Sequence, residues 1–159
     1  MPQAGSGRLL NTFTASRHTV GGRSYARDEV ETQFRILGAI EVDVGGRGAR
    51  VPRGRALSLL GLLLVHRGAV VHLDRVVDEL WEGAGPQHAR NAVHVVASRL
   101  RSALGDGAIV SEGGGYAVAL APGALDADRF EEGFRRGRDE LARGEPLETA
   151  ATLREALAL

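Results

Sequence analysis

The chain has 159 residues, 43% of them hydrophobic and 25% charged, and its 20 basic and 20 acidic side chains give a formal net charge of zero. This length accommodates one core of globular size with a small appendage, and the absence of cysteine excludes disulfides, a thiolate nucleophile and a zinc knuckle. The longest apolar stretch, residues 59–65, is too short to cross a bilayer, so we expect a cytoplasmic protein without a membrane partner.

Residues 1–33 contain few apolar side chains and no sustained hydrophobic period, and glycine, serine and threonine punctuate them. This composition predicts a disordered N-terminal tail. A transit peptide has a similar arginine-rich start, but a plain tail or a wrongly assigned start codon fits the composition better.

A folded domain is expected over residues 34–121, because apolar side chains there follow regular periods. Alternation predicts strands, and helical spacing predicts amphipathic helices. The expected strands are 34–37, 40–44 and 49–51, and the expected helices are 52–66, 73–82 and 87–104. A hairpin tipped by Gly113, Gly114 and Gly115 then follows, with strands on both sides.

Residues 122–159 have a purely helical pattern, with one helix over 126–143 and a second from Leu147 to the chain end. A lone helical hairpin buries its apolar face poorly and needs stacked neighbours. The chain is therefore predicted to be an α+β protein that ends in a helical hairpin.

The helix predicted over residues 87–104 carries the most informative pattern. Its expected core face is apolar, its other face is polar and basic, and no acidic residue occurs between Gln87 and Gly105. Such a face suits the major groove of DNA, where arginine binds guanine edges or phosphates, asparagine binds adenine, and an apolar side chain contacts a thymine methyl. The predicted DNA-binding residues are Arg90, Asn91, His94, Val95, Ser98, Arg99 and Arg101. A solvated face on an arginine-rich protein is the alternative.

No enzymatic function is expected, and no metal or cofactor either. His88 and His94 are six residues apart and face different sides of their helix, so they are not a ligand pair. The glycine-rich run 45–48 lacks the Lys-Ser/Thr pair of a phosphate-binding loop. No nucleophile–base pair stands out.

The order of these elements, two helices across a short turn followed by a glycine-tipped hairpin, is that of a winged helix-turn-helix. The run 89–105, which contains Ser98-Arg99-Leu100-Arg101, resembles the recognition helix of OmpR/PhoB-type winged helices, and Leu80-Trp81 and Gly115-Tyr116 match that family in position. Within it, the chain resembles the SARP/AfsR-type regulators of actinomycetes. Residues 122–131 and 153–159 resemble the opening of the bacterial transcriptional activation domain that follows the winged helix there.

The resemblance implies a winged helix-turn-helix with an N-terminal antiparallel sheet over 34–121, followed by a TPR-like helical hairpin over 122–159, which is the truncated start of the activation domain. It also implies a sequence-specific transcriptional regulator that binds double-stranded DNA, with RNA polymerase and a second copy on direct repeats as further partners. The wing is Glu112, Gly113 and Gly114, and Glu112 stands where family members often carry a basic residue. Because a carboxylate repels phosphates, we expect the wing to add little affinity.

An alternative function is a protein-interaction module. The shortened helical pair would then dock on a full-length relative, and DNA binding would be vestigial.

Overall fold

The computed structural model describes residues 17–20, 23–26, 31–81 and 86–159. Its strands are β1 (Arg17–Val20), β2 (Arg23–Ala26), β3 (Thr32–Arg35), β4 (Glu41–Val44), β5 (Arg47–Gly48), β6 (Val71–His72), β7 (Ile109–Glu112) and β8 (Gly115–Val118). Its helices are α1 (Arg55–Val65), α2 (Leu73–Leu80), α3 (Pro86–Leu104), α4 (Asp126–Ala142) and α5 (Pro146–Leu157). No helix within these described segments is long and apolar enough to span a membrane.

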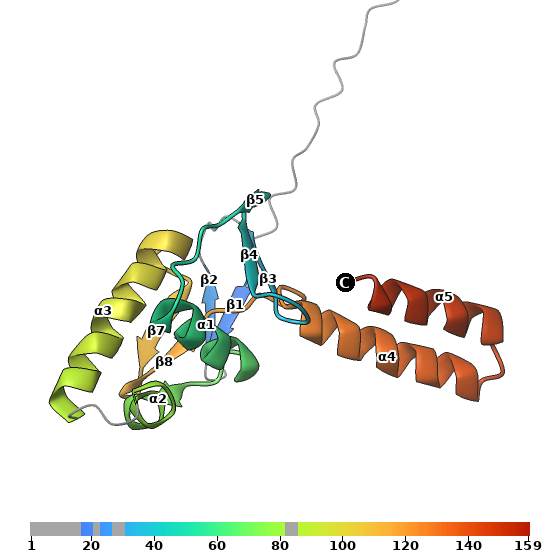
Figure 1. Ribbon diagram of the computed structural model, residues 1–159. Helices are drawn as coiled ribbons and strands as arrows, with labels where there is room; N and C mark the ends of the chain where they lie inside the picture. The colour runs from blue at the N-terminus through green and yellow to red at the C-terminus, as the bar shows by residue number, and fades with distance from the viewer. Residues whose placement is uncertain (1–16, 21–22, 27–30, 82–85) are drawn as a thin grey trace, which may run out of the picture.

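The fold is the expected α+β arrangement, in which α1, α2 and α3 pack with two small antiparallel sheets and a helical pair projects from one side (Figure 1). The first of these sheets has the order β3-β4-β5 and the second the order β6-β8-β7, while β1 and β2 form a separate two-stranded sheet. The fully buried leucines of α1, at positions 59, 60, 63 and 64, lie in one core with Val93 and Leu100 of α3. Helix α1 is therefore the centre on which α2, α3 and both sheets are assembled.

The structure differs from the sequence-based expectations in several short elements. Part of the segment expected to be a disordered tail, residues 1–33, forms the antiparallel hairpin β1–β2, and β3 begins at Thr32. The third strand of the first sheet is β5 at residues 47–48 instead of 49–51. Helix α1 begins at Arg55, because Gly54 precedes it in a left-handed conformation with φ of 74°. Strand β6, only two residues long, was not expected at all.

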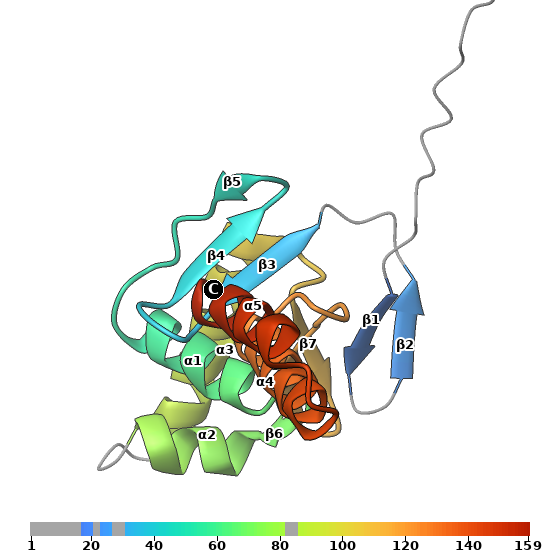
Figure 2. The same ribbon diagram turned by 90° about the vertical axis from the view of Figure 1, so that its right-hand side faces the viewer.

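Helices α4 and α5 pack against each other through two glycines of α4 (Figure 2). A Cβ atom on Gly133 would lie 2.8 Å from Ala156 Cβ, and one on Gly137 would lie 2.7 Å from Leu153 Cδ2. The buried Glu140 accepts a hydrogen bond from Thr152 Oγ1 at 3.0 Å. The outer surface of the pair remains apolar in places, with Phe134, Leu141, Leu147 and Leu157 exposed.

Asp126, the first residue of α4, joins the helical pair to the first sheet. Its carboxylate is 1% exposed and accepts hydrogen bonds from the backbone N–H groups of Ile36 at 2.9 and 3.0 Å, Leu37 at 3.1 Å and Ala127 at 2.8 Å. Just before it, Leu125 pairs with Phe34 in a parallel bridge, and Phe34 N donates to Ala124 O at 2.7 Å. The chain entering α4 thus continues the edge of the sheet.

An exposed ion-pair cluster lies beside this junction. Arg67, which follows α1, pairs with Asp128 at 3.0 Å and with Glu131. The hydrogen bond from Arg67 lowers the pKa of the Glu131 carboxyl. Because all three side chains are in contact with solvent, this cluster contributes much less to stability than Asp126 does.

Replacing Asp126 by Asn is expected to lower the free energy of unfolding by about 2–4 kcal/mol, because an amide removes the charge and turns an NH2 group toward backbone donors. Urea unfolding followed by circular dichroism measures the change. Asp128→Asn, in the same helical turn but at a half-exposed ion pair, is the control and should cost less than about 1 kcal/mol. An equal loss of unfolding free energy in the two variants would show that Asp126 does not hold α4 to the sheet.

Candidate nucleic-acid interface

Helix α3 has one buried face and one exposed face, as its sequence pattern predicts. The side chains at 93, 96, 97, 100 and 104 are buried against α1, α2 and the second sheet. The opposite face exposes Asn91, His94, Val95, Ser98 and Arg99 in one row. Helix α3 lies along the outer edge of the molecule, on the side away from α4 and α5 (Figure 1). A large partner can therefore approach this face of α3 without contacting α4 and α5.

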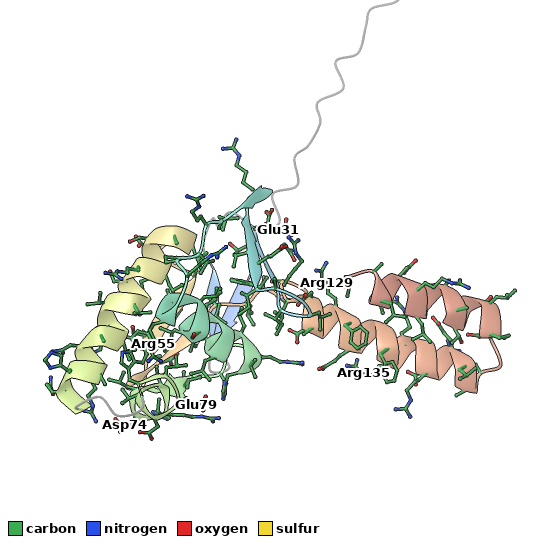
Figure 3. The ribbon with its side chains drawn as sticks, in the orientation of Figure 1. Glu31, Arg55, Asp74, Glu79, Arg129 and Arg135 are labelled. Atoms are coloured by element: carbon green, nitrogen blue, oxygen red, sulfur yellow. The ribbon has the colours of Figure 1, made fainter. Side chains whose placement is uncertain are left out.

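Two arginines of α3 differ in their availability for a partner. Arg90 Nη2 donates to Asp74 Oδ1 at 2.6 Å, across to the α2 residue labelled in Figure 3. Both side chains are largely exposed, so this pair is weak and exchangeable. Arg99 is exposed, and within the described part of the chain no hydrogen bond or ion pair holds its guanidinium. Of the arginines on α3, Arg99 is the cation most open to a phosphate or a base.

Arg101 does not belong to the exposed row, although the sequence analysis grouped it with Arg99. Its Nε donates to the backbone oxygen of Ile109 at 2.8 Å, and its Nη2 donates to Ser111 Oγ at 2.7 Å. Its guanidinium carbon also lies 5.8 Å from the ring centroid of Tyr116. Arg101 thus ties the end of α3 to β7, and its Nε and Nη2 already donate inside the protein.

His94 is a residue of α3 whose side chain contacts the hairpin β7–β8. Its Nδ1 is 2.5 Å from the hydroxyl oxygen of Tyr116, and the two rings meet edge to face with centroids 6.0 Å apart. The residue is nevertheless exposed, so the rest of its ring faces outward. Tyr116 is buried and is not among the site residues predicted from the sequence, because its contact with His94 joins different elements at positions 22 residues apart.

The hairpin β7–β8 forms the predicted wing. Its turn consists of Gly113 and Gly114, with φ values of 56° and 77°, which are the positive values of a two-residue type I′ turn. The wing is fastened to the start of α2, since Leu73 N donates to Gly114 O at 3.1 Å and His72 pairs with Gly115. Gly115 has no room for a side chain, because a Cβ there would lie 2.3 Å from Val71 O.

A groove of about 280 Å³ separates the wing from α3, and His94, Ser111, Glu112 and Tyr116 contribute to its lining. Glu112 therefore lies beside the exposed face of α3. Among the described residues, no group of three histidine or acidic side chains is placed to hold a metal ion.

The structure thus gathers most of the predicted residues on one surface. Asn91, His94, Val95, Ser98 and Arg99 share the exposed face, which we call the α3 face. Arg90 lies at the start of the helix in its pair with Asp74, and Arg101 is directed to β7. The α3 face carries donors, an apolar side chain and a cation without a carboxylate, which is the chemistry of a groove-binding helix.

Several known proteins are similar to this chain, and the matched region includes α3. Residues 52–118 match the family model described as transcriptional regulatory protein, C terminal. The regulatory protein AfsR of Streptomyces coelicolor is 34% identical over 128 residues, which are 80% of this chain and 13% of AfsR. The transcriptional regulatory protein MoaR1 of Mycobacterium tuberculosis is 33% identical over 70% of this chain and 38% of its own length. The transcriptional regulator RedD of Streptomyces coelicolor is 30% identical over 62% of this chain and 30% of its own length.

A solved structure shares the fold. Mycobacterium tuberculosis EmbR, in complex with a low affinity phosphopeptide, superposes with a TM-score of 0.75 and 24% sequence identity, covering 82% of this chain and 36% of EmbR. The chain spans less than two fifths of the length of each of these relatives.

The different placements of Arg99 and Arg101 lead to opposite expectations for stability. Arg101→Ala should lower the free energy of unfolding by about 1–3 kcal/mol, because it leaves Ile109 O and Ser111 Oγ without their donor. Arg99→Ala should change it by less than about 0.5 kcal/mol, as at other exposed sites. Urea unfolding of both variants measures this difference, and equal stabilities would contradict the assignment of Arg101 to the wing.

Proposed function

Because the chain is similar to the SARP/AfsR-type transcriptional regulators and carries their OmpR/PhoB-type winged helix, we propose that it is a sequence-specific DNA-binding regulator of transcription. In this proposal α3 enters the major groove with its exposed face toward the bases. The observation that carries it is the α3 face itself, where no described residue engages the Arg99 guanidinium and no acidic residue occurs between Gln87 and Gly105.

The roles within the α3 face follow from the chemistry of each side chain. Arg99 binds guanine or a phosphate, Asn91 is suited to adenine, and Val95, 52% exposed, is suited to a thymine methyl. Ser98 and Arg90 contact the phosphate backbone, for which Arg90 exchanges its pair with Asp74. Arg101 supports the helix from behind and makes at most a secondary contact.

The partners follow the same proposal. Double-stranded DNA is the primary partner, and the protein acts in the cytoplasm, where bacterial DNA is accessible. Residues 122–159 form the first helices of a transcriptional activation domain, which would present a surface to RNA polymerase. Two copies would bind side by side on a direct repeat.

A second candidate function is docking on another protein through the helical pair. The exposed apolar side chains of α4 and α5 favour it, with Leu147 and Leu157 at 81% and 78% exposure. Salt separates the two functions, because binding through phosphates weakens steeply as salt rises and apolar docking does not.

Arg99→Ala tests the proposal most directly. A binding site is first selected from a random duplex pool with the wild-type protein, and affinity for it is then measured across a salt series. We expect the variant to lose about 1–3 kcal/mol of binding free energy if Arg99 binds guanine in a bidentate manner. A phosphate contact would instead weaken binding to all sequences and reduce the salt slope by about one.

Arg129→Ala is the matched control, because Arg129 is an exposed arginine near the start of α4, away from α3 (Figure 3). Its affinity and salt slope should equal those of the wild type. If Arg99→Ala also binds like the wild type, α3 is not the DNA-binding element.

The charge of the wing gives an independent expectation. Glu112→Arg should raise affinity and steepen the slope of log affinity against log salt by about one to two units, because it removes a repulsion and adds a cation near the phosphates. Glu112→Gln should recover only part of the gain. Electrophoretic mobility shifts at several salt concentrations measure both, and slopes unchanged in both variants would remove the wing from the DNA footprint.

A further inference from the structure

Four side chains link the interior of the wing to the exposed face of α3. Arg101 Nη2 lies 2.7 Å from Ser111 Oγ, Ser111 lies directly opposite Tyr116 in the β7–β8 register, and the Tyr116 hydroxyl lies 2.5 Å from His94 Nδ1. The row begins at a residue held by the backbone of β7 and ends at a histidine ring on the α3 face.

The direction of the hydrogen bonding is fixed at the Arg101 end of the row. A guanidinium only donates, so Ser111 Oγ accepts from Arg101 and keeps its own hydrogen for another acceptor. Ser111 stands opposite Tyr116 in the β7–β8 register, and the pKa of Tyr116 is raised chiefly by burial and lowered by the Arg101 charge and by Ser111. A phenol with a raised pKa retains its proton at neutral pH, and this proton is available for His94 Nδ1.

The tautomer of His94 depends on which partner donates in its contact with Tyr116. When Nδ1 of a neutral imidazole accepts a hydrogen bond, the ring hydrogen resides on Nε2. We propose that Ser111 and Tyr116 are positioning residues that fix this tautomer, so that His94 presents its Nε2–H as a donor to bound DNA. The inference rests on the proposed function for its last step, while the tautomer itself is a property of the free protein.

An Nε2–H fixed on His94 can bind only groups that accept a hydrogen bond. Guanine O6 and N7, adenine N7, thymine O4 and phosphate oxygens all accept a hydrogen bond, whereas the amino groups of cytosine and adenine do not. Without the relay, either ring nitrogen of a neutral histidine carries the hydrogen, and the selection for acceptors is lost. The wing would thus influence base recognition without touching a base.

The tautomer is tested on the full chain without DNA, by ¹⁵N–¹H correlation spectra of histidine-labelled protein at pH 8, where an ordinary histidine is neutral. The ring signals of His94 are assigned by their loss in His94→Gln. We expect a hydrogen-bearing Nε2 and a bare Nδ1 in the wild type. Tyr116→Phe, which retains the buried ring, should give a mixture of the two tautomers, and Ser111→Ala should move the signals in the same direction.

Ser102→Ala is the control, because the Ser102 hydroxyl bonds only to Ser98 O of its own helix, at 3.2 Å, within the described structure. Its His94 signals should match the wild type. A hydrogen on Nδ1 in the wild type, or an identical pattern in Tyr116→Phe, would overturn the relay.

The DNA arm uses the selected site. Tyr116→Phe should lower affinity about fivefold, the value of one hydrogen bond, and should flatten the preference at one base pair if the acceptor is a base. If the acceptor is a phosphate, the loss should instead disappear on duplexes in which a single phosphate is replaced by a neutral methylphosphonate. Wild-type affinity in Tyr116→Phe would overturn the role of the relay in recognition. If the wild-type protein selects no duplex from the pool and no variant binds DNA, the proposed function is rejected. The tautomer result remains valid in that case, because it is measured without DNA.

Discussion

The buried carboxylate of Asp126 holds the helical pair α4–α5 against the sheet β3-β4-β5, and the arrangement of the two parts depends on it. A charge without solvent is costly unless hydrogen bonds compensate it, and here backbone N–H groups of residues 36, 37 and 127 do so. Two of those donors come from the segment after β3 and one from α4 itself. Because the same carboxylate binds both, the orientation of α4 relative to the sheet is defined by short, directional contacts, and α3 on the far side of α1 inherits a definite position relative to the helical pair.

The periodic parts of the chain were predictable from the sequence because their burial is periodic. The leucines of α1 and the alternating faces of α3 repeat at helical spacing, and the structure buries the same side chains that the pattern assigns to the core. The glycine-tipped hairpin was equally clear, since positive φ at Gly113 and Gly114 requires the residue type that marks the turn. In these elements the local pattern and the tertiary packing favour the same conformation.

The remaining features depend on contacts between distant segments, which no local pattern contains. Strand β6 has two residues and exists because β8 pairs with it. Arg101 belongs to the same polar pattern in the sequence as Arg99, yet its hydrogen bonds to Ile109 O and Ser111 Oγ direct its side chain away from the exposed face. Tyr116 gains its importance only when β8 brings it beside His94. The helix that carries the candidate site was therefore predictable, whereas the division of its side chains between the exposed face and internal contacts was not.

The three successive glycines of the wing restrict how its charge can vary. Gly113 and Gly114 have open space around them but positive φ, so asparagine or aspartate can replace them at modest cost and most other residues cannot. Gly115 has no space at all, since Val71 O occupies the position of a side chain. The glycine positions of this tip therefore do not admit a lysine or arginine without strain or a clash, whereas residue 112, the last residue of β7, can carry a cation next to the turn.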